Sequence, residues 1–421
     1  MNKNLLLIAA LIVASAVIYV SNNQSSEDNS IQASFAAVPG LRGGQDQFGP
    51  YEVVENWPQD ISELPGNEAW TYGAGQSVFA ESPDRVFLLH RGELPNIDAP
   101  ERTVYPEAGP ALSFPVAQLP WRNASVGPRA SLPGALEGDD TDRGEYGVDH
   151  RWNHCLVVVN REGDIIEDWT QWDSLFRRPH YVTINPYDPE KHVWVVDDFR
   201  HAIFKFTNDG SELVQTIGIP NVSGNDEEHF SRPTFMAFLP DAFFVADGYA
   251  NTRVVKFDND GNYLMSWGEA GNPPNETRPG FMNNVHGVAV DVQSRRVFVN
   301  DRANNRVQVF TDNGEYLDEW SFGEEPADIH LFYIGADNIL WAADRATSKI
   351  LGYDLDGNFL YSWGILGDFP GGMWGVHGLS VDQEGNFYVA EVGNGRIQKF
   401  KPRAGARIET MVGKPVYAAW Q

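Results

Sequence analysis

The chain has 421 residues, including 40 Gly and 26 Pro, and 12% of its residues are aromatic and 21% charged. Such a composition can bury a large core, and its Gly and Pro content argues against a helical bundle. The net charge of −27 disfavours nucleic acid as a partner, because a phosphate backbone attracts clustered Lys and Arg. The single cysteine, Cys155, excludes an intrachain disulfide.

The chain begins with a predicted export signal. Lys3 precedes an apolar run from Leu5 to Val20, which is shorter than the roughly 20 residues of a full membrane span. Residues 14–16, Ala-Ser-Ala, fit a cleavage site, so residues 1–20 are interpreted as a signal peptide, with an uncleaved N-terminal anchor as the alternative. In either case we expect an extracytoplasmic protein, periplasmic or secreted, which an uncleaved segment would tether to the membrane.

One unit repeats through the rest of the chain. The stretch from 285 to 320 recurs at 376–400 and, less closely, at 232–268. Each copy has the pattern of four short strands, with an Asp-Gly or Asn-Gly turn between the third and fourth. The turn glycines of successive units are 43 to 53 residues apart, at Gly163, Gly210, Gly261, Gly314 and Gly357. Four-stranded units at this period predict propeller blades.

The chain length fits six blades of about 44 residues each. We therefore predict an all-β fold, a six-bladed β-propeller over residues 71–413, between a lead segment at 21–70 and a C-terminal tail at 414–421. A long insert in the first blade, residues 93–150, is expected to cover the active-site face. Residues 51–54 resemble a blade's fourth strand, and residues 407–412 compete with them to close the ring. Several β-sandwiches in series are the alternative architecture.

Three histidines occupy equivalent places in alternate units. His180, His286 and His377 each open a first strand, which in a propeller lines the central channel. Blades two, four and six are a third of a turn apart, so the imidazoles are predicted to converge as a three-His metal site with an open fourth position. Zinc suits this set best, although His alone does not distinguish it from iron or copper. In the fifth unit the position equivalent to these histidines falls at Ala327–Asp328, and His330 is a reserve ligand.

The loops after the second strands surround the same end of the channel. These loops carry Arg91 in the first unit, Tyr249 in the third and Arg302 in the fourth. The loop with Tyr249 is one residue longer than its counterparts, which singles that tyrosine out. Arg91 follows no repeat pattern, and a guanidinium suits the bidentate capture of a carboxylate.

Six short motifs carry a resemblance to a known family. They are His90-Arg91-Gly92, Arg178-Pro179-His180, Asp247-Gly248-Tyr249, Val285-His286-Gly287, Asp301-Arg302-Ala303-Asn304 and Val376-His377-Gly378. Through them the propeller resembles the peptidyl-α-hydroxyglycine α-amidating lyases, which are NHL-repeat propellers. The resemblance implies a zinc-dependent carbon–nitrogen lyase that cleaves a small-molecule or peptide α-hydroxyglycine into an amide and glyoxylate.

The same resemblance implies roles for individual residues. It implies that the zinc ligands are His180, His286 and His377, that Tyr249 is the catalytic base, and that Arg91 and Arg302 contact substrate. A collapse of the substrate alkoxide would then expel the amide nitrogen. In this picture Arg91 holds the carboxylate and, together with the metal, lowers the pKa of Tyr249.

One position departs from the family pattern. The family has Asp directly after the last metal His, where it joins a structural calcium site, and this chain has Gly378. The backbone carbonyls of Val78 and Val182 match the other calcium positions. Without the carboxylate the site loses its charge, so Ca²⁺ is disfavoured here.

Two other functions stay open. A metal-dependent hydrolase such as a lactonase would use metal-bound water on the same propeller, although carboxylate ligands are common in such propellers and the three-His set argues against it. A non-enzymatic propeller that docks a partner is the base-rate expectation for NHL-type repeats.

Overall fold

A computed structural model of the chain describes residues 48–98, 124, 145–323 and 327–420. The predicted signal segment at 1–20 with its cleavage site, the lead segment up to residue 47 and most of the 93–150 insert lie outside the described residues. None of the helices in the described ranges has the length and hydropathy of a membrane span.

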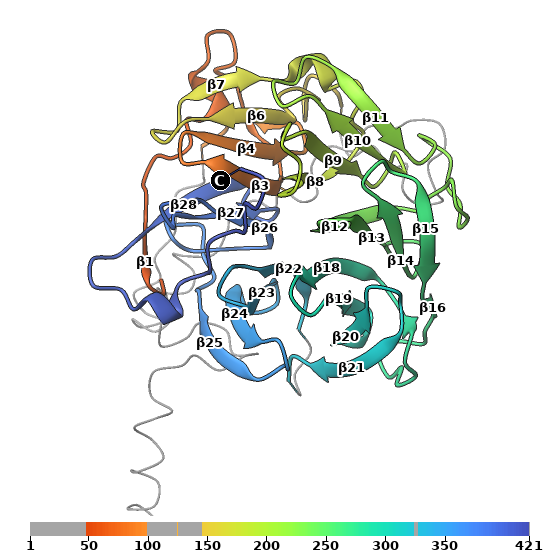
Figure 1. The fold of residues 1–421 in the computed structure, drawn as a ribbon. Coiled ribbons are helices and arrows are strands. Elements are labelled where there is room, and N and C mark those ends of the chain that lie inside the picture. The colour runs from red at the N-terminus through yellow and green to blue at the C-terminus, as the bar shows by residue number, and fades with distance from the viewer. Residues whose placement is uncertain (1–47, 99–123, 125–144, 324–326, 421) are drawn as a thin grey trace, which may run out of the picture.

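Six four-stranded antiparallel sheets surround a central channel (Figure 1), which confirms the prediction of an all-β six-bladed propeller. The first blade contains β3 (Gly75–Ser82), β4 (Arg85–His90), β6 (Leu156–Val159) and β7 (Ile165–Asp168). The second contains β8 (Pro179–Ile184), β9 (Val193–Asp197), β10 (Ala202–Phe206) and β11 (Leu213–Ile217). The third contains β12 (Pro233–Leu239), β13 (Ala242–Asp247), β14 (Arg253–Asp258) and β15 (Tyr263–Trp267).

The other half of the ring repeats this plan. The fourth blade contains β18 (Val285–Asp291), β19 (Arg296–Asp301), β20 (Arg306–Thr311) and β21 (Tyr316–Ser321). The fifth contains β22 (Ile329–Ile334), β23 (Ile339–Asp344), β24 (Lys349–Asp354) and β25 (Phe359–Trp363). The sixth contains β26 (Val376–Val381), β27 (Phe387–Glu391), β28 (Arg396–Pro402) and β1 (Tyr51–Val53). Two small sheets pair β2 (Trp70–Tyr72) with β5 (Glu93–Pro95) and β16 (Glu269–Ala270) with β17 (Phe281–Met282).

A strand from the N-terminal part of the chain closes the ring. Strand β1 pairs antiparallel with β28, with Tyr51 opposite Pro402 and Val53 opposite Phe400. Residues 51–53 thus join the last sheet although they precede the expected boundary at residue 71. The competing segment contains the short 3₁₀ helix η6 (Ile408–Thr410) instead of a strand.

Turn glycines help neighbouring blades to pack. Gly357 has a φ of +85°, and a Cβ atom there would lie 2.4 Å from Cγ of Trp320, which belongs to β21 of the preceding blade. Gly210 packs in the same way against Trp169, with a corresponding distance of 2.5 Å to its Cε2. Glycine at these turns therefore permits both the positive φ and the close approach of an indole ring.

A β-bulge recurs at the start of every first strand. In each blade the register between first and second strands shifts just after the first strand begins. Bulges re-aim side chains. The bulge residue, which directly follows the first paired residue of the strand, is in successive blades Gln76, His180, Thr234, His286, His330 and His377. In the fifth blade, His330 therefore holds the position that the sequence register assigned to Ala327–Asp328. The connection before β22, residues 322–328, is shorter than the corresponding connections before β8, β12, β18 and β26, and this difference displaced the register inferred from sequence.

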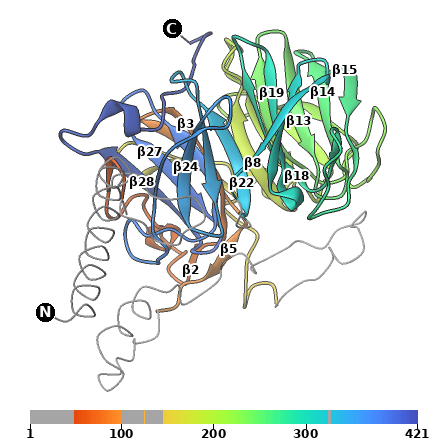
Figure 2. The same ribbon diagram turned by 90° about the horizontal axis from the view of Figure 1, so that it is seen from below.

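The two faces of the ring are covered differently. The β2–β5 sheet, from which the long insert departs, lies on one face, and the C-terminus lies on the opposite face (Figure 2). The tail crosses several blades: Tyr333 Oη donates to the Gly413 carbonyl (2.8 Å), Tyr417 Oη to the Ala80 carbonyl (2.8 Å), and Trp420 Nε1 to the Asp188 carbonyl (3.0 Å). These bonds fix the tail to the propeller.

Candidate metal centre

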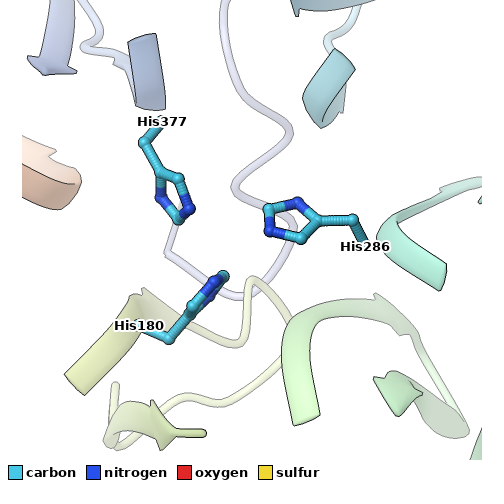
Figure 3. Close-up of side chains that lie close together, drawn as sticks. All are labelled: His180, His286 and His377. Carbon is cyan, nitrogen blue, oxygen red and sulfur yellow. The ribbon is translucent and has the colours of Figure 1, made fainter. Parts of the chain in front are cut away.

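Three imidazoles from alternate blades converge in the channel (Figure 3). His180, His286 and His377 are carried by β8, β18 and β26 and are almost completely buried. Their ring centroids lie 4.6 to 5.3 Å apart, and one ring nitrogen from each lies within 4.8 Å of the others. The structure therefore brings together the three histidines that the repeat pattern singled out.

Hydrogen bonds to neighbouring blades orient these rings. Nδ1 of His180 lies 3.1 Å from the carbonyl oxygen of Thr234, and Nδ1 of His377 lies 2.9 Å from that of Gln76. Nδ1 of His286 makes the equivalent bond to the His330 carbonyl. Because a carbonyl only accepts, Nδ1 carries the proton in each ring and Nε2 is left with a free lone pair.

The arrangement fits a divalent metal ion. Each acceptor carbonyl belongs to the bulge residue of the next blade, so one contact repeats three times around the axis. Backbone carbonyls commonly orient metal-binding histidines in this way. Within the described chain, the buried Nε2 of His377 has no hydrogen-bond partner, as expected for an atom reserved for a ligand.

Burial keeps the three rings neutral. It lowers the pKa of His180, His286 and His377 well below the usual value for histidine, and nearby positive charges add to this effect. Neutral imidazole is the form that binds metal.

The hydroxyl of Tyr249 lies between two of these rings. Its oxygen is 2.8 Å from Nε2 of His286 and 3.2 Å from Nε2 of His180. The expected site tyrosine thus contacts the histidine cluster directly. Its hydroxyl proton can reach either nitrogen, because both Nε2 atoms are acceptors.

Two arginines flank the Tyr249 ring. The guanidinium carbon of Arg232 lies 4.8 Å from the ring centroid and that of Arg178 lies 5.5 Å away. Both form ion pairs with the fully buried Asp198, Arg232 at 3.0 Å and Arg178 at 3.4 Å. The sequence alone did not indicate a role for Arg232 or Asp198. Their only distinguishing feature is that Arg232 directly precedes β12 and Asp198 directly follows β9.

The two arginines expected from sequence lie on other sides of the channel. Arg91 is buried and its Nη2 donates to Oε1 of Gln76 at 2.7 Å. The positive charge of Arg91 helps to lower the pKa of His180 and His377. Arg91 is linked through Gln76 to the candidate ligand His377, whereas the guanidinium groups over the Tyr249 ring belong to Arg178 and Arg232.

Arg302 is held by the fifth blade. Its Nε donates to Oδ1 of Asp328 at 2.6 Å, and its Nη2 donates to Nε2 of His330 at 2.9 Å. Burial raises the pKa of Asp328, but His330 and Arg302 together outweigh this effect and hold it far below the usual range. The reserve ligand His330 therefore uses Nε2 to position Arg302, although its ring centroid is only 5.4 Å from that of His286.

The region compared with the family's calcium site is tightly packed. A Cβ atom added to Gly378 would lie 2.7 Å from Cα of Ser77 and 3.2 Å from Cβ of Ala390. Ser77 Oγ donates to the Val182 carbonyl at 3.5 Å, while Val78 is buried in the same strand, β3. A carboxylate at position 378 would require β3 to move.

An apolar layer underlies the histidines. The buried ring of Phe235 lies 5.1 Å from His180, 5.2 Å from His286 and 5.7 Å from His377 between centroids. Phe235 belongs to a core cluster that also contains Leu331 and Leu379. This layer separates the metal centre from a cavity of about 170 Å³ at the end of the channel that the C-terminal tail covers.

Comparison with known proteins places this architecture in a family. A model described as NHL repeat matches residues 373–400, and one described as 6-bladed beta-propeller matches residues 283–365. NHL repeat-containing protein 3 of Homo sapiens is 30% identical over 277 residues, which cover 59% of this chain and 76% of that protein. The chain belongs to the family of NHL-repeat six-bladed β-propellers.

Relatives named as amidating enzymes also match, which confirms the resemblance stated from the motifs. Peptidyl-glycine alpha-amidating monooxygenase B of Xenopus laevis is 27% identical over 283 residues, 62% of this chain and 31% of that protein. Probable peptidyl-alpha-hydroxyglycine alpha-amidating lyase pgal-1 of Caenorhabditis elegans is 32% identical over 160 residues, 38% of this chain and 43% of that protein. The matched region thus spans less than half the length of either relative.

Proposed function

We propose that this protein is an exported, zinc-dependent lyase that cleaves the carbon–nitrogen bond of an α-hydroxyglycine-type carbinolamide to give an amide and glyoxylate. The observation that carries the proposal is the convergence of three histidine Nε2 atoms with the Tyr249 hydroxyl 2.8 and 3.2 Å from two of them. The similarity to proteins named as amidating lyases supports the same reaction class.

The metal would be held by Nε2 of His180, His286 and His377. When bound there, zinc supplies a Lewis acid that lowers the pKa of a coordinated hydroxyl group. The three-His set, which leaves a coordination position open, is typical of catalytic zinc. Calcium is not part of the proposal, because the packing around Gly378 leaves no room for the expected carboxylate.

The protein's own groups account for the proton and for orientation. In its deprotonated form, Tyr249 accepts the proton of the substrate hydroxyl, whose C–O bond becomes the aldehyde C=O of glyoxylate. The C–N bond breaks, its electron pair goes to nitrogen, and Tyr249 returns the proton to that nitrogen to complete the amide. Arg91 holds the carboxylate and thereby orients the C–N bond for cleavage.

The direct test combines metal analysis with a product assay. Purified protein should contain about one zinc per chain and release glyoxylate and benzamide from α-hydroxyhippurate. Chelation should abolish the release and added zinc should restore it. Protein that contains zinc but releases no glyoxylate would disprove the lyase activity and retain the metal site.

A second function, partner binding without catalysis, is favoured by one observation. Of the three relatives compared, the one that the chain matches over the greater part of its length is named only as an NHL repeat-containing protein. In that case His180→Ala and His377→Ala would leave binding of a partner intact, and purified protein would carry no metal.

A further inference from the structure

The six bulge residues divide into two alternating sets. Three of them are the histidines of the candidate metal centre, and the other three are Gln76, Thr234 and His330. The Thr234 hydroxyl donates to the carbonyl of His286 at 2.6 Å, and His330 accepts from Arg302. The Thr234 hydroxyl and Nε2 of His330 are thus engaged within the protein, whereas Nδ1 of His330 has no hydrogen-bond partner among the described residues.

Gln76 has a side-chain amide of which one half is unused. The residue is completely buried, and its Oε1 accepts a hydrogen bond from Arg91 Nη2 at 2.7 Å. An arginine has only donors, so the amide oxygen must face it and the NH₂ group must point the other way. No atom in the described ranges of the chain accepts a hydrogen bond from this Nε2. A buried unsatisfied donor is destabilising, and an acceptor on a ligand would remove that cost.

The unused donor lies next to the candidate metal centre. Gln76 is bonded through its own carbonyl oxygen to Nδ1 of His377 at 2.9 Å. The guanidinium of Arg91 is hydrogen-bonded to the side-chain amide of the same residue, so the amide and the guanidinium lie side by side next to His377.

We infer that Gln76 is a substrate-binding residue whose amide donates to one carboxylate oxygen while Arg91 binds the same carboxylate. The inference rests on the proposed function and specifies how the anionic end of its substrate is recognised. A carboxylate has two oxygens that accept hydrogen bonds, which suits a neutral and a cationic donor in adjacent positions. It also gives a chain of net charge −27 a local site for an anion.

Two substitutions separate substrate binding by Gln76 from the positioning of Arg91. Gln76→Glu keeps an acceptor for Arg91 but replaces the donor with a negatively charged oxygen. Gln76→Met keeps the length of the side chain and removes both polar atoms. Neither changes the backbone carbonyl that orients His377. The probe is hippurate, which lacks the reacting hydroxyl, and hippuramide is the matched ligand without the carboxylate.

Calorimetry on the zinc-loaded protein should give different results for the two ligands. Hippurate should bind about tenfold more weakly to Gln76→Met and about 100-fold more weakly to Gln76→Glu. Hippuramide affinity should change less than hippurate affinity in both variants. Gln383→Glu, the same change on an exposed loop, is the control, and zinc content and the thermal midpoint verify that each variant is folded and loaded.

The outcomes distinguish this inference from the proposed function. Wild-type protein that binds hippurate with the expected dependence on Gln76 but releases no glyoxylate disproves the lyase activity alone. Wild-type affinity in Gln76→Glu would show that the residue only positions Arg91 and would overturn the inference. Equal weakening for hippurate and hippuramide, or a wild-type protein that does not bind hippurate, would overturn it as well.

Discussion

His377 donates a hydrogen bond from Nδ1 to the carbonyl oxygen of Gln76, 2.9 Å away, although 301 positions separate the two residues in the chain. The bond joins the last blade to the first. Corresponding bonds join the second blade to the third and the fourth to the fifth. The orientation of each candidate metal ligand is therefore set by a neighbouring blade and depends on a closed ring.

Removal of one histidine should impair metal binding. His180→Ala, His286→Ala or His377→Ala leaves two nitrogen ligands, and we expect zinc affinity to fall at least about 100-fold, because even the loss of an orienting contact costs 10–100-fold. Competition with a chromophoric chelator measures the affinity. His229→Ala, at a surface position paired with Asp226, should bind zinc like wild type. Unchanged affinity in the single histidine variants would contradict the assignment.

Loss of the Tyr249 hydroxyl should slow the reaction without loss of metal. Tyr249→Phe keeps the ring between Arg178 and Arg232 but removes the group 2.8 Å from His286 Nε2. Because general bases contribute about 10²–10⁴-fold, kcat for α-hydroxyhippurate should fall by that factor while zinc content stays the same. Steady-state kinetics with parallel metal analysis measure both. A variant with normal kcat would exclude Tyr249 as the base.

The hydroxyl of Thr234 should stabilise the ring around His286. It is completely buried and donates to the His286 carbonyl at 2.6 Å. Thr234→Val has nearly the same shape but leaves that carbonyl unsatisfied, so the free energy of unfolding should fall by about 1–3 kcal/mol. Urea denaturation measures the change. Thr234→Ser retains the hydroxyl and should lose less, whereas equal losses in the two variants would point to the methyl group instead.

His90 should make folding stability depend on pH. Both its ring nitrogens are buried without a hydrogen-bond partner among the described residues, and burial lowers its pKa to about 3. Unfolded histidine titrates near 6.5. Between these values the unfolded state binds one more proton, so the protein loses stability as the pH falls below about 6.5.

His90→Phe should remove that dependence while a ring still stacks on Tyr72, whose centroid is 4.0 Å from that of His90. The stability of the variant relative to wild type should rise by about 2 kcal/mol between pH 7 and pH 5, at about 1.4 kcal/mol per unit below the unfolded pKa. Denaturation at several pH values gives this difference and cancels contributions shared by both proteins. A difference that does not vary with pH would contradict the neutral, buried state of His90.

The repeats made much of the fold predictable from sequence. Hairpin glycines and alternating strands recur at a nearly constant spacing, and they place His180, His286 and His377 on alternate blades without any knowledge of side-chain contacts. The predicted alignment of the fifth unit was wrong, because His330 holds the bulge position that Ala327–Asp328 was expected to hold. Few turn residues mark the start of that blade.

The surroundings of the histidines were less predictable, because they depend on contacts between blades. Asp198 pairs with Arg178 next to it in space and with Arg232 from the following blade, and nothing in its local sequence indicates either contact. Gln76 follows a glycine at the start of β3 and has no counterpart of its own type at the other bulge positions. Sequence repeats therefore identify the positions that the blades share, but they do not identify site residues, such as Gln76, that occur in one blade only.

The ring of Phe235 packs against all three histidines of the candidate metal centre from one side. Because this ring and the apolar layer around it block the channel below the histidines, a ligand enters and leaves on the face opposite the C-terminal tail. If the proposed cleavage takes place there, its two products would depart along the route by which the next substrate arrives. The product that leaves last would then compete directly with substrate, and added product should inhibit turnover.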